Sequence, residues 1–108
     1  LRAEPLRRWR RRVGTVLGER VVLNEFVGYL SLSNMTTGEG ALSERTVTIA
    51  TFALCGFANF ASVAIQIGGI STLVPERRPD LAKLGLRAMV GGLLACYLTA
   101  SVAGLLMR

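Results

Sequence analysis

The chain has 108 residues, of which 51% are hydrophobic and 19% charged, and its formal net charge is +6. Two runs, residues 46–75 and 88–107, contain no charged residue, and both exceed the roughly 18 apolar residues that a membrane-spanning helix requires. The composition therefore excludes an ordinary soluble domain. Since the chain has no His, imidazole catalysis and imidazole metal ligation are also excluded within it.

The two cysteines, Cys55 and Cys96, lie far apart in the sequence and in apolar surroundings. Their spacing fits neither a metal site nor a disulfide framework, so we interpret them as small buried hydrophobic residues. We expect no catalytic residue, no metal-binding residue and no bound cofactor in this chain, and we do not expect an enzyme.

A basic segment, residues 1–12, opens the chain, and the sequence has no initiating Met. We therefore interpret the chain as a fragment of a longer protein. Five of the 13 basic residues lie within residues 7–12. Because basic and aromatic residues do not alternate elsewhere, the positive charge does not indicate nucleic-acid binding.

Residues 13–32 are moderately apolar but include Glu19, Arg20 and Glu25. These are too many charges for a simple lipid-facing span, because each ionisable group is costly in hydrocarbon. We predict a short or re-entrant element in this part of the chain.

Residues 33–44 are rich in Ser, Thr, Asn and Gly, which favour turns, and we predict an exposed loop there. Ser43 and Glu44 lie at the end of this loop. They are predicted to cap the next helix, with the glutamate well placed against the helix dipole.

The following segment, residues 45–75, is too long for one straight membrane helix. Its 30 uncharged residues, 46–75, would extend about 45 Å as one helix, whereas the hydrocarbon core of a bilayer is about 30 Å thick. We predict a discontinuous transmembrane helix that breaks at Gly56 or at Gly68 and Gly69, since glycine weakens helices.

Residues 76–87 contain four basic and two acidic residues. The positive-inside tendency predicts a basic cytoplasmic loop there, and residues 88–107 are predicted to form the final transmembrane helix. Small residues at four-residue spacing predict two places of close helix packing: Gly91 with Ala95, and Ala100 with Gly104.

Asn59 and Ser62 are polar residues near the middle of the uncharged run. An unsatisfied amide in hydrocarbon costs several kcal/mol, so Asn59 must face protein, water or a ligand. Ser62 lies three residues later, on the same face of a helix. The pair is suited to binding a small polar molecule. Hydrogen bonding to a neighbouring helix alone is an equal alternative.

Glu25 is the second candidate for binding, because it is a single charge in the apolar stretch 21–30. An ionisable residue in such a place is a functional hypothesis by default. As a carboxylate it could accept hydrogen bonds from two vicinal hydroxyl groups. The alternative is a structural ion pair with Arg20.

Three sequence blocks resemble the concentrative nucleoside transporter family. They are Val-Leu-Asn-Glu-Phe-Val at residues 22–27, Ala-Leu-Cys-Gly-Phe-Ala-Asn-Phe at 53–60 and Ile-Gln-Ile-Gly-Gly at 65–69. The blocks occur in the order that the family has, and the resemblance extends from about residue 14 to residue 106.

The resemblance implies an all-α integral membrane fold that is part of an inverted-repeat transporter. Residues 13–32 would be a re-entrant hairpin, mainly its returning arm, followed by the discontinuous helix and the last span. The protein would be a homotrimer in the plasma (inner) membrane that takes up nucleosides with a coupling cation, Na⁺ or H⁺, bound outside this segment.

Site residues also follow from the resemblance. The motif positions correspond to Glu25, Asn59 and Ser62, which would bind the ribose hydroxyl groups. Phe57 would lie against the base.

Two alternatives remain. The first is a small two-span membrane protein that acts as a structural or assembly subunit through its Gly and Ala faces. The second is an intramembrane enzyme based on Glu25. The enzyme is disfavoured, because the chain lacks His, a cluster of metal ligands and a second carboxylate near the middle of the membrane.

Overall fold

The computed structural model describes residues 3–38 and 40–107, and every element within them is helical. This confirms the expected all-α class. The elements are α1 (Ala3–Val22), α2 (Glu25–Asn34), α3 (Glu44–Leu54), α4 (Phe60–Leu73), the 3₁₀ turn η1 (Pro75–Arg77) and α5 (Arg78–Leu106).

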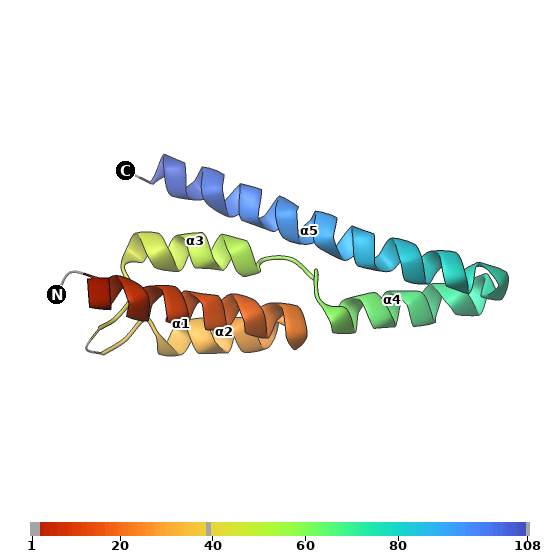
Figure 1. The fold of residues 1–108 in the computed structure, drawn as a ribbon, viewed down its shortest axis with the longest axis horizontal. Helices are drawn as coiled ribbons and strands as arrows, with labels where there is room; N and C mark the ends of the chain where they lie inside the picture. Colours follow the sequence, from red (N-terminus) through yellow and green to blue (C-terminus); the bar gives the residue numbers. More distant parts are fainter. Residues whose placement is uncertain (1–2, 39, 108) are drawn as a thin grey trace.

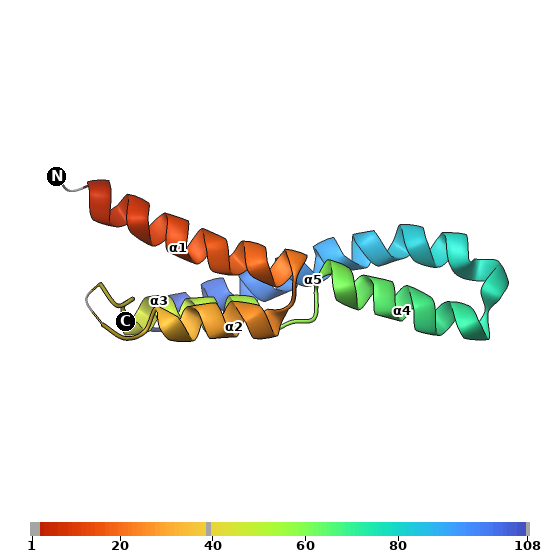
Figure 2. The ribbon, with the colours of Figure 1, turned by 90° about the horizontal axis from the view of Figure 1, so that it is seen from below.

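The helices form an elongated bundle of 58 × 25 × 21 Å. Helices α3 and α4 follow each other along the long axis, and α5 runs back beside both of them (Figure 1). Helices α1 and α2 form an antiparallel hairpin that packs against α3 (Figure 2). The hairpin and α3 enclose a small core of four buried residues: Val16, Leu32, Ala50 and Leu54.

The hairpin turns at Leu23 and Asn24. Asn24 ends the turn as the N-cap of α2, because its Oδ1 accepts a hydrogen bond from the backbone N–H of Val27 at 3.0 Å. Such a cap satisfies one of the free N–H groups that begin every helix. The next residue, Glu25, therefore occupies the first turn of α2, at the tip of the hairpin.

The outgoing arm is longer than expected from the sequence. Helix α1 begins at Ala3, so residues 3–12 belong to the hairpin and do not form a separate basic segment. The hairpin consequently has two full arms and is not mainly a returning arm. The physical reason is that Arg is a strong helix former, and no Gly or Pro interrupts the basic stretch between Leu6 and Val13.

The segment 45–75 contains two helices, α3 and α4, separated by the non-helical residues 55–59. Of the two expected break points, Gly56 lies in the break, whereas Gly68 and Gly69 lie within α4. Ser43 is the N-cap of α3, as expected, and its Oγ accepts a hydrogen bond from Thr46 N at 3.3 Å.

The expected loop at residues 76–87 is largely wrong, because α5 begins at Arg78. Pro79 suits the first turn of a helix, where its missing N–H needs no partner. Asp80 in the same turn is favourable for the helix dipole and pairs with Arg77 at 3.0 Å. The segment Pro75–Leu106 contains an 18-residue window with a mean hydropathy of 1.8, and it is the one helix in the described ranges that is long and apolar enough to cross a membrane.

Helix α5 approaches its neighbours closely at three glycines. A Cβ at Gly104 would lie 2.8 Å from Ile49 in α3, one at Gly92 would lie 3.2 Å from Ala58 in the break, and one at Gly85 would lie 3.0 Å from Val63 in α4. Ala100 and Gly104 are buried, which agrees with one of the two packing places expected from the sequence. At the other place the described residues make no close contact, because a Cβ at Gly91 would meet nothing within 4 Å.

Gly28 generates the first prediction. A Cβ there would lie 3.0 Å from Leu54 Cδ2, 3.4 Å from Val16 O and 3.5 Å from Arg20 Cβ. Gly28→Leu should therefore destabilise the full-length protein by about 1–3 kcal/mol, the usual cost of overpacking. The measurement is the thermal midpoint Tm in detergent. Gly18→Leu is the matched control, since a Cβ at that position meets nothing within 4 Å. Equal losses of Tm in the two variants would contradict the packing described.

Candidate functional site

Glu25, Asn59 and Ser62 come together where the tip of the hairpin meets the break between α3 and α4. Asn59 Nδ2 donates a hydrogen bond to Glu25 Oε2 at 3.1 Å. Asn59 Oδ1 accepts from the Ser62 backbone N–H at 2.8 Å and from Ser62 Oγ at 2.9 Å. Although Glu25 and Asn59 are 34 positions apart in the sequence, the three residues form one polar cluster.

Asn59 is the structural centre of this polar cluster. It is the N-cap of α4 and only 1% exposed. Its amide satisfies one free N–H of α4 and at the same time fixes the hairpin tip. The sequence left open whether Asn59 only bonds a neighbouring helix, and the structure shows that it bonds Glu25 of α2 as well as its own helix.

Glu25 keeps hydrogen-bonding capacity for another molecule. It is half-buried, and within the described residues only its Oε2 has a hydrogen-bond partner. A carboxylate has about four acceptor positions on its two oxygens. The carboxylate can therefore hold Asn59 and still accept hydrogen bonds from hydroxyl groups that approach Oε1.

The alternative role of Glu25, an ion pair with Arg20, is wrong. Arg20 Nη2 donates to Gly56 O at 3.0 Å and to Cys96 Sγ at 3.3 Å. The one salt bridge within the described ranges is that of Arg77 with Asp80. Because Arg20 is engaged elsewhere, the carboxylate of Glu25 has no neutralising partner in this part of the chain.

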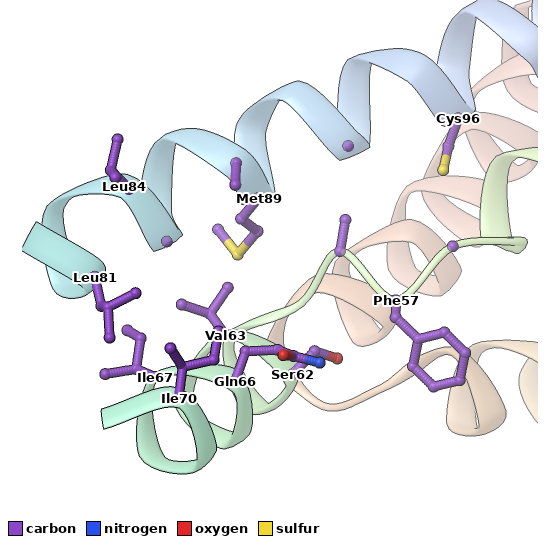
Figure 3. Close-up of a pocket in the computed structure, with 15 residues that line it drawn as sticks. Phe57, Ser62, Val63, Gln66, Ile67, Ile70, Leu81, Leu84, Met89 and Cys96 are labelled. Atoms are coloured by element: carbon purple, nitrogen blue, oxygen red, sulfur yellow. The ribbon is translucent and has the colours of Figure 1, made fainter. Parts of the chain in front are cut away.

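Phe57 lies in the break but does not join the polar cluster. Its side chain is 76% exposed, and the ring projects away from Met89 and Cys96 (Figure 3). An exposed aromatic face two residues before Asn59 offers a surface on which a planar ring could stack.

Ser62 also borders an apolar groove of about 460 Å³ between α4 and α5. Most of its lining is aliphatic, and Gln66 supplies a second polar side chain beside Ser62 (Figure 3). Gln66 is not among the site residues expected from the sequence. Its spacing in the sequence indicates the position, because Gln66 lies four residues after Ser62 and therefore on the same face of α4.

Metal ligands do not cluster in residues 3–38 and 40–107, where no three His, Cys, Asp or Glu side chains lie close enough to hold an ion. Both cysteines are free thiols. Cys96 is half-buried beside Arg20, whereas Cys55 is exposed, so the expected burial of Cys55 is wrong within this chain.

Comparison with known proteins gives matches to membrane transporters. Residues 10–104 match a family model described as Na⁺ dependent nucleoside transporter C-terminus. The chain is 50% identical over 92 residues to an uncharacterized transporter, YutK, of Bacillus subtilis (strain 168), and this match covers 85% of the chain. It is 41% identical over 106 residues to sodium/nucleoside cotransporter 1 of Rattus norvegicus, where the match covers 87% of the chain.

A solved structure of CNTnw, described as inward-facing and substrate-bound, resembles the chain with a TM-score of 0.79 at 45% identity. The alignment covers 86% of this chain and 23% of that one. The chain likewise spans 22% of YutK and 16% of the rat cotransporter. It therefore corresponds to less than a quarter of the length of each of these three proteins.

The hydrogen bond between Glu25 and Asn59 generates the second prediction. Asn59→Asp retains an oxygen that can cap α4 but places two carboxylates in contact, so it should lower the Tm of the full-length protein. Adding Glu25→Gln supplies an amide donor opposite the carboxylate that Asn59→Asp introduces. The double variant should therefore be more stable than the two single effects predict, with a coupling energy of about 0.5–3 kcal/mol.

The measurement is a double-mutant cycle on the four purified proteins in detergent. Additive changes in stability, with no recovery in the double variant, would show that the two side chains do not interact.

Proposed function

Because this chain belongs to the Na⁺-dependent nucleoside transporter C-terminal family, we propose that it supplies the ribose-binding residues of a cation-coupled nucleoside uptake transporter. The observation that carries this proposal is the polar cluster of Glu25, Asn59 and Ser62. These groups meet at two helix ends, whereas the surfaces around them are largely apolar.

The chemistry of the polar cluster fits vicinal hydroxyl groups. Glu25 provides carboxylate oxygens as strong acceptors. Asn59 and Ser62 provide an amide and a hydroxyl, which can exchange their mutual hydrogen bonds for bonds to a ligand. A ribose presents two adjacent hydroxyl groups as donors and acceptors, so one ring can engage all three side chains.

Phe57 is proposed to lie against the base of the nucleoside. A nucleobase is planar and stacks favourably on an aromatic face. The exposed ring of Phe57 is two residues from Asn59, so a nucleoside whose ribose is held by the polar cluster could place its base there. Gln66 is a second polar side chain within about one turn of Ser62.

The proposed membrane arrangement follows from helix lengths. Helices α3 and α4, with 11 and 14 residues, are about 16 and 21 Å long and neither spans a bilayer alone. Together they would form one discontinuous transmembrane helix, beside a re-entrant hairpin α1–α2 and the spanning helix α5. The basic residues before and within the start of α5 would face the cytoplasm, in the plasma (inner) membrane.

The reaction is movement of solute and involves no covalent step. A nucleoside would bind near the middle of the membrane, a cation would bind elsewhere in the protein, and the loaded unit would turn to the cytoplasm. The cation site is assigned to the part of the protein outside this chain, and the complete transporter is proposed to be a homotrimer.

The third prediction concerns uptake by the full-length protein. Glu25→Gln, Asn59→Ala and Ser62→Ala should each reduce the uptake of radiolabelled uridine or adenosine while the proteins still insert. Glu25→Gln should have the largest effect, at least about tenfold, since a hydrogen bond to a charged group is worth about 1.5–3 kcal/mol.

Matched controls are Ser71→Ala and Glu76→Gln. Ser71 is on the same helix but is bonded, among the described residues, only to α4 backbone carbonyls, and Glu76 lies in the exposed turn η1. Both controls should transport normally. Normal uptake in all three site variants would refute the assignment of the ribose-binding residues.

The fourth prediction concerns the coupling cation, for which the family description and the name of the rat cotransporter favour Na⁺. Replacing external Na⁺ with choline at constant pH should abolish concentrative uptake. A protonophore at constant Na⁺ should leave the initial rate nearly unchanged. The reverse pattern would identify H⁺ as the coupling cation and would correct this part of the proposal.

A further inference from the structure

The C-terminal end of α3 is covered by side chains of the hairpin. Tyr29 Oη donates to Thr51 O at 3.0 Å, and Arg20 Nη2 donates to Gly56 O at 3.0 Å. The last carbonyl groups of a helix have no partner within the helix and carry a partial negative charge. Arg20 therefore brings a full positive charge to the carbonyl of Gly56, two residues beyond the negative end of α3.

Arg20 is buried to an unusual degree for a guanidinium. Its exposed fraction is 0%, and its Nε and Nη1 have no hydrogen-bond partner within the described residues. Arg remains charged in proteins, so deprotonation cannot remove the cost of burial. No carboxylate pairs with it in residues 3–38 and 40–107.

The contacts that Arg20 does make are those of a cation held by dipoles and polarisable groups. They are the carbonyl of Gly56, the thiol of Cys96 at 3.3 Å and the face of Tyr97, whose centroid lies 6.0 Å from the guanidinium carbon. An aromatic face at this distance attracts a cation. Three elements, namely α1, the break and α5, therefore meet at one positive charge.

In transporters with discontinuous helices, unwound carbonyl groups and the C-terminal ends of half-helices are the groups that coordinate mobile cations. Here a covalently attached cation occupies that position. We propose that Arg20 is a fixed internal cation at the end of α3, that it positions the break from Gly56 to Asn59, and that it keeps this half of the protein from binding a mobile cation there.

Arg20 acts through its neighbours and is a positioning residue, since the hydrogen bonds that it makes within the described residues go to Gly56 and Cys96 and not to the polar cluster. Its bond to Gly56 O fixes the backbone three residues before Asn59. Gly56 has no room to move toward α5, because a Cβ there would lie 2.6 Å from Cys96 Sγ. Loss of the charge should therefore displace the polar cluster. It should weaken ligand binding more than it lowers the maximal rate of transport.

The test uses the full-length protein with Arg20→Ala, Arg20→Lys and Arg20→Gln. Nucleoside uptake gives KM and the maximal rate, and this arm rests on the proposed function. The Tm without nucleoside is a second readout and does not rest on it. Each variant is measured alone, with millimolar guanidinium and with the same concentration of urea, the neutral molecule of similar shape.

We expect Arg20→Ala to raise KM by about tenfold or more, the scale of a charge at a partly buried helix end, with a smaller change in the maximal rate. Guanidinium should restore both KM and Tm, and urea should not. The KM and Tm of Arg20→Lys should be closer to the wild-type values than those of Arg20→Gln, because Lys retains the positive charge and Gln does not. Glu25→Gln, whose defect lies in ligand contact, should not respond to guanidinium.

Three results would overturn the proposal: wild-type KM and Tm in Arg20→Ala, equal rescue by urea, or equal behaviour of Arg20→Lys and Arg20→Gln. If Arg20→Ala does not insert into the membrane, the KM and Tm of Arg20→Lys and Arg20→Gln decide whether the proposal holds. If the protein carries no nucleoside, guanidinium should still raise the Tm of Arg20→Ala alone, so failure of the proposed function is distinguishable from failure of this inference.

Discussion

The constraint on which this structure depends is the set of free backbone groups at a helix break inside an apolar molecule. Ending α3 and restarting as α4 leaves carbonyl groups at one end and N–H groups at the other, and hydrocarbon offers no partner for either. The hairpin supplies partners on both sides. Tyr29 donates to a carbonyl oxygen in the last turn of α3, and Arg20 donates to the carbonyl of Gly56 in the break. Asn59 caps α4 and is held by Glu25.

The charges on the hairpin match the two helix dipoles. Arg20 lies before the turn and meets the negative end of α3, and Glu25 lies after the turn and meets the positive end of α4. The same arrangement explains why the polar cluster is where it is. A polar group can persist in this environment only if it is satisfied, and the break is the place where the hairpin supplies hydrogen-bond partners to polar groups.

Much of this could be predicted from the sequence. An uncharged run longer than a bilayer required a break, and Asn59, Ser62 and Glu25 were conspicuous because polar groups are costly in an apolar run. The length of α1 and the start of α5 could not be predicted. Both lie in runs of charged residues, which are typical of loops, although Arg itself favours helix. The role of Arg20 was also hidden, since its partners Gly56 and Cys96 are 36 and 76 residues away. Membership of the transporter family excludes the two alternatives raised from the sequence, a small two-span assembly protein and an intramembrane enzyme.

The long C-terminal helix has a mechanical consequence for the break. Helix α5 closely approaches α3 at Gly104, the break at Gly92 and α4 at Gly85. It therefore packs along both half-helices and supports the break between them. A bend at residues 55–59 would have to change at least one of these close approaches, which leave no room for an added Cβ. Helix α5 therefore restrains bending at the interruption, and we expect α3, α4 and α5 to move together.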